Sequence, residues 1–121
     1  MANFLGSPCA RFVSQGICKV NVSTWSPIHS RLSQGLSELP NRQWVKFQGR
    51  GADNIRLAIK YVNVDASGNF TVPTSTAHDA IVYPSMAIIE EPISDSVRIF
   101  ARAVQNGGSA GGFKVVCAEY A

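Results

Sequence analysis

The sequence predicts an all-β protein, a single antiparallel β-sandwich or barrel similar to a jelly roll, with about seven or eight strands. Apolar and polar residues alternate with a period of two in several runs, which is the spacing of side chains along a strand. Turn-forming residues separate almost every pair of these runs. The length of 121 residues suits one domain with a single core.

The clearest alternation lies in residues 55–62, 97–103 and 113–118. In the first of these runs, alternate residues from Ile55 to Tyr61 fall on one face and those from Arg56 to Val62 on the other. Further strands are expected for QWVKFQG (43–49) and CARFVSQGICKVNVS (9–23), and shorter ones for GNFTVP (68–73) and SMAIIEEP (85–92).

Residues 26–42 depart from this alternation. Their leucines have a loosely helical spacing, but Gly35 interrupts it and Pro40 ends it. We therefore expect an extended loop with one helical turn. Residues 1–24 are expected to form an N-terminal strand or arm, and residues 25–121 the body of the sandwich, all within one domain.

Composition limits the classes of function. Charged residues make up 16% of the chain, below the ~25% of an average soluble domain, while hydrophobic residues make up 45%. This balance excludes a disordered tail and suggests that other protein covers part of the surface. The net charge of +3 comes without a clustered Lys/Arg tract, so nucleic acid is not an expected partner.

The three cysteines, Cys9, Cys18 and Cys117, are odd in number and form no CxxC pair. A disulfide framework or a zinc site is therefore not expected, and we interpret them as small buried residues in a reducing compartment. The N-terminus lacks the pattern of a signal peptide, and no apolar run reaches the length of a membrane span.

The glycine-rich stretch NGGSAGG (106–112) raises the question of a phosphate-binding loop. Such a loop needs a helix directly after it, since the free N–H groups of the helix N-terminus bind the anion. The residues that follow, FKVVCAEY, have the composition of a strand. We therefore interpret the stretch as a hairpin connection between the last two strands.

No constellation of residues predicts catalysis. His78 and Asp79 are adjacent, so on an extended chain they point to opposite faces, and no GxSxG elbow is present. Glu90 and Glu91 lack the further oxygen ligands that Ca²⁺ needs. We expect no catalytic residue, no cofactor and no metal. A small nuclease is the enzymatic alternative, but the chain lacks a carboxylate cluster for its metal.

Four cations form the sharpest pattern: Arg56, Lys60, Arg98 and Arg102. Within each pair the spacing of four residues places both side chains on one face of a strand. Such a stripe could contact nucleic acid or an acidic partner. The alternative, which we favour, is an ordinary solvated outer face of a sandwich.

Aromatic residues supply candidate interface anchors, because they dominate the energetics of buried contacts. Trp25, Trp44 and an exposed Phe100 are the candidates, but for Trp44, which lies inside a predicted strand, a place in the core is at least as good an interpretation. Together with the four cations, Trp25 and Phe100 form the predicted interface.

The stretch LPNRQWVKFQGRGADNIRLAIKYVNVDASGNFTVP, followed by YPSMAIIEEPI and the closing VRIFARAVQNGGSAGGFKVVCAEY, resembles a pattern of strands and turns in small virion proteins of tailed bacteriophages. The similarity runs from about Leu39 to the C-terminus and lies in strand order and turn placement.

The resemblance implies a non-enzymatic structural protein of the virion, assembled in the host cytoplasm, of the type that decorates or cements the head. The implied partners are the major capsid protein or another virion protein and further copies of the chain, with a trimer favoured; no membrane is implied. The alternative is a carbohydrate- or receptor-binding β-sandwich module on a virion or a cell-surface appendage, for which Trp25, Tyr83 and Tyr120 would be the first residues to test.

Overall fold

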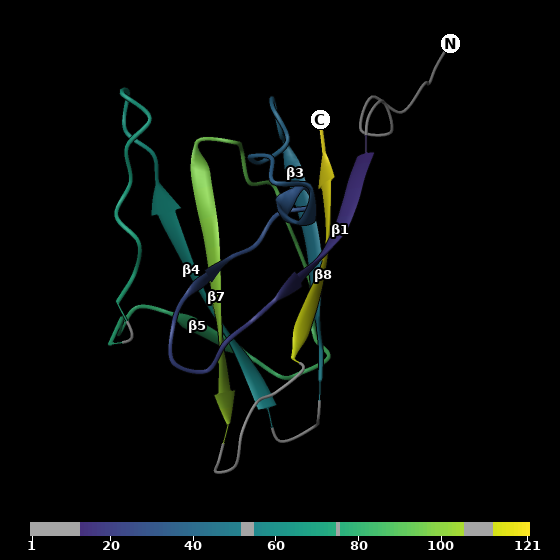
Figure 1. The fold of residues 1–121 in the computed structure, drawn as a ribbon, viewed down its shortest axis with the longest axis vertical. Helices are drawn as coiled ribbons and strands as arrows, with labels where there is room; N and C mark the ends of the chain where they lie inside the picture. The colour runs from purple at the N-terminus through teal and green to yellow at the C-terminus, as the bar shows by residue number, and fades with distance from the viewer. Residues whose placement is uncertain (1–12, 52–54, 75, 106–112) are drawn as a thin grey trace.

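A computed structural model describes residues 13–51, 55–74, 76–105 and 113–121 of the chain. Within them, eight strands form two four-stranded antiparallel sheets (Figure 1). The strands are β1 (Val13–Lys19), β2 (Ser26–Pro27), β3 (Trp44–Arg50), β4 (Ile55–Asn63), β5 (Ile81–Tyr83), β6 (Ile88–Glu91), β7 (Val97–Gln105) and β8 (Lys114–Tyr120). The predicted all-β sandwich is confirmed, and the sheets are not closed into a barrel.

The strand order is that of a jelly roll. One sheet has the order β1-β8-β3-β6 and the other the order β2-β7-β4-β5. The pairs are nested along the chain: β4 with β5, β3 with β6, β2 with β7 and β1 with β8. The chain thus behaves as one long hairpin folded across two sheets, as in double-sheet jelly rolls.

This topology corrects the expectation for the glycine-rich stretch. Strands β7 and β8 belong to different sheets, so the stretch between them joins the two sheets and does not close a hairpin. Residues 106–112 themselves lie outside the described part of the chain.

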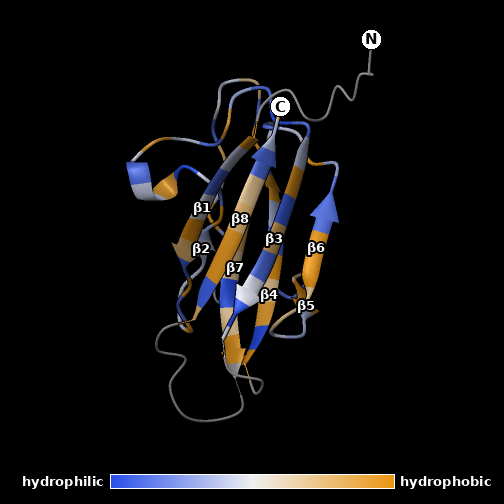
Figure 2. Ribbon diagram, turned by 90° about the vertical axis from the view of Figure 1, so that its right-hand side faces the viewer, coloured by the Kyte–Doolittle hydropathy of each residue, from blue (hydrophilic) through white to orange (hydrophobic). Residues whose placement is uncertain are grey.

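The core lies between the sheets and follows from the period-two pattern. Leu57 and Ile59 of β4 and Ala101 of β7 are 0% exposed, and they face Val45, Val115 and Cys117 of the opposite sheet, which are also 0% exposed. Removing each large apolar side chain from water contributes about 1.5–3 kcal/mol. Figure 2 views the molecule from the β1-β8-β3-β6 side, and apolar residues alternate with polar ones along its strands.

Most predicted strands are confirmed. The three runs with the clearest alternation form β4, β7 and β8, and the runs at 43–49 and 85–92 contain β3 and β6. Of the expected strand at 9–23, the structure describes residues 13–23, which contain β1. The short strand predicted for 68–73 is wrong, because that segment pairs with no strand. Strands β2 and β5 were missed.

The expected helical turn in residues 26–42 is confirmed as a 3₁₀ helix, Leu32–Gln34. It ends at Gly35, whose backbone is left-handed with φ of 71°. Within the segment expected to be an N-terminal strand or arm, β1 pairs along its whole length with β8 and is therefore an edge strand of the sandwich.

Candidate functional site

The four cations predicted to share a face do so. Arg56 and Lys60 lie on β4, and Arg98 and Arg102 lie on the adjacent β7. In the pairing of these strands Lys60 lies opposite Phe100 and Ala58 opposite Arg102. All four cations therefore project from the outer side of the β2-β7-β4-β5 sheet.

That outer side is not open to solvent as expected, because residues 64–74 and 76–80 of the same chain, the covering segment, lie over it (Figure 1). Ala58 and Phe100 of this sheet are only 2% and 4% exposed. The Phe70 ring lies 6.0 Å from the Phe100 ring, and the indole N–H of Trp25 donates a hydrogen bond to the Thr74 carbonyl. The expectation that Phe100 is exposed is wrong, and Trp25 is likewise buried in this chain.

Three of the four cations are engaged within the chain. Lys60 pairs with Asp79 of the covering segment. Arg98 forms an ion pair of 3.0 Å with Glu38 and lies over the Phe70 ring.

Arg102 donates to the Val22 carbonyl at 3.1 Å and lies over the Trp25 ring. Only Arg56 is both exposed and outside these contacts. Lys60 and Arg98 thus contact the covering segment, whereas Arg102 contacts residues 22–25. The predicted stripe is therefore not a free cationic surface.

The opposite sheet carries a face that no described segment covers, and we call it the open face. It consists of the outward side chains of β1, β8, β3 and β6 (the sheet nearest the viewer in Figure 2). Strand register arranges them in four rows: Val13–Tyr120–Trp44, Gln15–Ala118–Lys46–Glu90, Ile17–Val116–Gln48–Ile88, and Lys19–Lys114–Arg50.

Large apolar side chains are exposed on the open face. Ile17 and Ile88, at opposite edges of one row, are 57% and 58% exposed, and Trp44 is 39% exposed. The equally weighted core interpretation of Trp44 is therefore wrong. A shallow depression of about 190 Å³ lies between Lys46, Ile88 and Tyr120. Exposed apolar side chains that share one flat face are typical of a contact surface.

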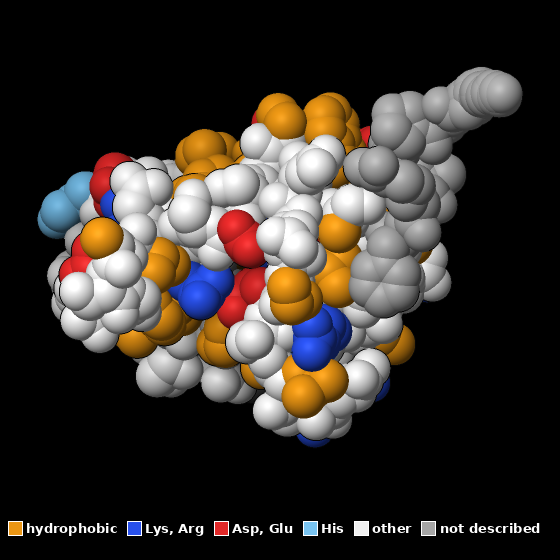
Figure 3. Space-filling view, turned by 90° about the horizontal axis from the view of Figure 1, so that it is seen from above, with side chains coloured by type: hydrophobic (Ala, Val, Ile, Leu, Met, Phe, Trp, Pro, Cys, Tyr) orange, Lys and Arg blue, Asp and Glu red, His pale blue; other side chains and the backbone are white. Residues whose placement is uncertain are grey.

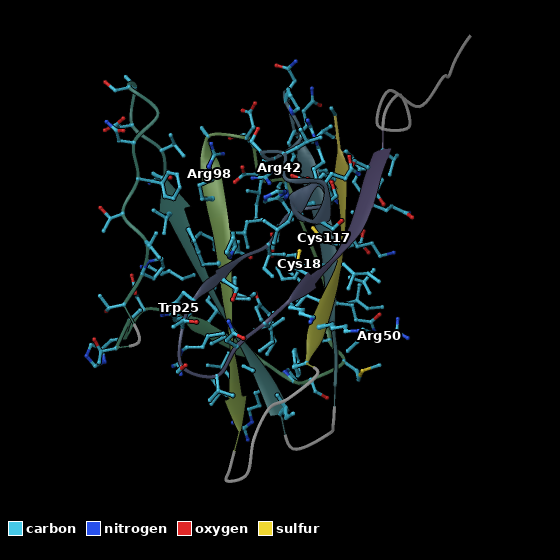
Figure 4. The ribbon with its side chains drawn as sticks, viewed as in Figure 1. Cys18, Trp25, Arg42, Arg50, Arg98 and Cys117 are labelled. Atoms are coloured by element: carbon cyan, nitrogen blue, oxygen red, sulfur yellow. The ribbon has the colours of Figure 1, made fainter. Side chains whose placement is uncertain are left out.

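The last row of the open face is entirely cationic, and we call Lys19, Lys114 and Arg50 the cationic row. Lys114 of β8 lies directly opposite both Lys19 of β1 and Arg50 of β3, and all three are exposed. Figure 4 shows Arg50 projecting away from the sandwich.

Like charges directly opposite one another on adjacent strands are destabilising, by about 1 kcal/mol or less per pair in water. The ion pairs among the described residues involve none of these three cations.

A buried polar network lies at the other end of the sandwich. Glu119 of β8 is 0% exposed and Arg42 is 1% exposed. Glu119 Oε1 accepts hydrogen bonds from Ser30 N–H at 2.8 Å and Ser30 Oγ at 2.5 Å, while Oε2 accepts from Arg42 Nη1 at 2.7 Å and Leu39 N–H at 3.3 Å. Arg42 also donates to the carbonyls of Ile93, Ser94 and Val97.

Both carboxylate oxygens of Glu119 already accept hydrogen bonds within the chain. Burial by itself raises the pKa of Glu119, but the hydrogen bonds from Ser30 and the charge of Arg42 outweigh burial and hold that pKa below its ordinary value. His29, which is 5% exposed, has a pKa below its ordinary value because burial disfavours the charged ring. Its Nδ1 accepts a hydrogen bond from Arg31 N–H.

Charges of both signs lie side by side at this end of the molecule (Figure 3). Asp95 accepts a hydrogen bond from Asn41 N–H, and Glu38 pairs with Arg98. The end of the open face that carries the cationic row lacks such pairing among the residues described.

Two further titratable residues that the sequence singled out, His78 and Asp79, lie at the surface in the part of the chain described. His78 is exposed, and its neighbour Asp79 pairs with Lys60. Within the described ranges, no three His, Cys, Asp or Glu side chains are close enough to hold a metal, and no helix is long and apolar enough to cross a membrane. Cys18 and Cys117 are free and buried in the core, and burial raises the pKa of both thiols.

A second hollow lies between the two sheets at the edge of the sandwich formed by β5 and β6. Its volume is about 500 Å³. Among its lining residues are Tyr61, Tyr83, Asn63 and Glu91. The Tyr61 hydroxyl is buried without a hydrogen-bond partner among the described atoms, and burial, the nearby Tyr83 and Glu91 raise its pKa.

Comparison with protein-family models, with curated proteins and with solved structures finds no match to this chain. The functional argument therefore depends on the fold and on the surfaces described above.

Proposed function

We propose that the chain is a non-enzymatic structural protein of a virus particle, of the type that decorates or cements the head of a tailed bacteriophage. The open face supports this proposal more than any other feature. Exposed Trp44, Ile17 and Ile88 lie on one flat sheet surface, which fits a contact with other protein. The jelly-roll topology is one that recurs in viral capsid proteins.

The rest of the molecule is suited to a passive role. The outer side of the second sheet is already occupied by the covering segment, and the polar atoms of Arg42 and Glu119 are engaged in hydrogen bonds within the chain. A particle component gains stability from many repeated contacts, each of which can be modest, so the chain needs no deep binding cleft.

Light scattering after size exclusion is the first test of how copies associate. We expect a closed oligomer, with a trimer favoured, if copies contact each other directly. The second test is co-sedimentation of the chain with empty heads of the phage that encodes it. Ile17→Ser combined with Ile88→Ser should abolish or weaken this addition, because both side chains lie on the open face.

Val72→Ser is the matched control, because Val72 is 53% exposed but lies on the covering segment. Combined with Val82→Ser on β5, where Val82 is 49% exposed, it removes two exposed apolar side chains away from the open face and should leave addition unchanged. A wild-type chain that never adds to heads, at any salt concentration, would refute the proposal.

The second candidate function is a carbohydrate-binding module, and the hollow beside β5 favours it. Two tyrosines, an amide and a carboxylate can together hydrogen-bond a polyhydroxyl ligand and contact its apolar face. Tyr83 lies in this hollow, whereas Trp25 is buried under the covering segment and Tyr120 lies on the open face.

Titration with simple hexoses, followed by NMR, tests this candidate. Shifts around Tyr83 that disappear in Tyr83→Ala, and persist in Tyr120→Ala, would support it. No shift at any of the lining residues would exclude these ligands.

A further inference from the structure

The open face is polarised along its strands. One end row contains Val13, Tyr120 and Trp44, whereas the opposite end row contains only Lys19, Lys114 and Arg50. The two rows between them are mainly apolar or uncharged, apart from Lys46 and Glu90, which lie opposite each other. A partner surface would therefore meet an aromatic end and a cationic end.

The open face also carries the charge imbalance of the whole chain. Four of its side chains are cationic (Lys19, Lys46, Arg50 and Lys114) and one, Glu90, is anionic. This excess of three positive charges equals the net charge of +3 of the chain, so the other residues are neutral in sum. The excess positive charge is thus concentrated on the open face, where its field can orient an approaching partner before contact.

We infer that the cationic row binds an acidic strip on a partner protein and thereby sets the orientation of the open face on that partner. This inference rests on the proposed function, in which the open face is the docking face. Aligned like charges weaken the isolated sheet, and an acidic strip opposite them would relieve that repulsion.

The composition of the face favours a protein surface over nucleic acid. A nucleic-acid site presents cations spread along the path of the phosphates. Here the cations are confined mainly to one end, and Ile17 and Ile88, both more than half exposed, lie in the adjacent row. An apolar centre with charges at its margin is the usual arrangement of a protein–protein contact.

The test neutralises the row with the triple substitution Lys19→Gln, Arg50→Gln and Lys114→Gln. Arg56→Gln is the control, because Arg56 is exposed and lies on the other sheet. Addition to heads at about 50 mM salt should weaken roughly tenfold or more in the triple variant and remain unchanged in Arg56→Gln. Raising the salt should weaken the wild type and leave the triple variant nearly insensitive.

Thermal unfolding shows whether weaker addition of the triple variant comes from lost docking or from lost stability. The triple variant removes repulsion between neighbouring cations, so its Tm should equal or exceed that of the wild type. Weaker addition together with an unchanged or higher Tm supports a role in docking. A triple variant that adds to heads as well as the wild type overturns the inference and leaves the proposed function standing.

A second measurement separates the inference from the proposed function. A glutamate-rich peptide is titrated into the isolated chain, and shifts are mapped by NMR. Shifts centred on the cationic row support recognition of acidic protein, even if the chain fails to add to heads and the proposed function falls. Absence of both peptide binding and salt-sensitive addition overturns the inference. Duplex DNA that binds the same row more tightly than the peptide overturns the acidic-protein assignment.

Discussion

Arg42 and Glu119 form an ion pair of 2.7 Å between Nη1 and Oε2, and both side chains are completely shielded from solvent. Glu119 lies on β8, whereas Arg42 lies just before β3 and donates to carbonyls in residues 93–97. Ser30 joins the same carboxylate from the loop after β2. The pair thus ties two connections, the one between β2 and β3 and the one between β6 and β7, to β8 at one end of the sandwich. Figure 4 labels Arg42 at this end.

Glu119→Gln should destabilise the protein strongly. Breaking a buried pair leaves the other charge without its partner, at a cost of about 3–5 kcal/mol. The measurement is the midpoint and slope of urea unfolding. Asp79→Asn is the control, since the Asp79 side chain is 69% exposed and a surface ion pair such as the one with Lys60 contributes little to stability. Equal losses in the two variants would contradict the structural role assigned to Glu119.

The free energy of unfolding should fall as the solution is acidified. The pKa of His29 lies below its ordinary value of 6.5, so below pH 6.5 the unfolded chain takes up a proton that the folded chain excludes. The pKa of Glu119 lies below its ordinary value of 4.5, so a second loss follows below pH 4.5. Both groups therefore stabilise the fold at neutral pH and lose that contribution as pH falls.

Urea unfolding at a series of pH values tests this dependence. His29→Gln should flatten the stability profile just below pH 6.5 while leaving the loss below pH 4.5. If the stability profiles of the variant and the wild type are parallel between pH 4.5 and 6.5, His29 is not the group that lowers stability in that range.

Gly16→Ala should destabilise the fold by more than an ordinary surface substitution. A Cβ at Gly16 would lie 2.1 Å from the Ser30 carbonyl oxygen, which is backbone and can move only with its segment. Because Ser30 also holds Glu119, the displacement would disturb the buried network. Thermal unfolding measures the loss.

Gly35→Ala provides the comparison for Gly16→Ala. Gly35 has open space around it and a left-handed backbone. Replacing it with alanine should therefore cost only the free energy of holding a residue with a Cβ in that conformation, about 1–2 kcal/mol. A smaller loss for Gly16→Ala than for Gly35→Ala would contradict the close packing of β1 on Ser30.

Cys18 and Cys117 should resist thiol reagents in the folded protein. Their side chains are buried and burial raises the pKa of both thiols, so little reactive thiolate forms at neutral pH. The measurement uses a Cys9→Ser variant and a colorimetric disulfide reagent, with and without urea. Both thiols should react only on unfolding; rapid reaction of either without urea would contradict the burial described.

The period-two alternation of apolar and polar residues predicted the long strands that pack one face against the core. Leu57, Ile59 and Ala101 alternate with residues of the other face, some of them cations, and such alternation marks a strand with one side in a core. The same pattern failed at 68–73, where Phe70 and Val72 suggested a strand. In the structure that segment packs on a sheet through side chains such as Phe70 and forms no ladder. Strand β5 was missed because its three residues are too few to show a period.

The candidate surface was predicted less well than the fold. Sequence spacing correctly placed Arg56 and Lys60 on one face, but the segment that covers this face lies elsewhere in the sequence. Its Asp79, for example, is 19 positions beyond Lys60, with which it pairs. The cationic row was missed because Lys19, Arg50 and Lys114 are far apart in sequence and adjacent only through strand register. A list of outward positions on the three strands could have suggested it, had their pairing been known.

By itself, the sequence determined that this protein is an all-β domain with short strands and a low content of charge, because side-chain alternation and turn chemistry are local properties. Tertiary structure alone decided which of the two sheets is covered, that Phe100 is buried and Trp44 exposed, and that three distant cations lie in one row. Those outcomes depend on nested pairing between strands such as β1 and β8, which lie at opposite ends of the chain. Pairing of this kind is set by the packing of the whole core and leaves no local signature in the residues that it brings together.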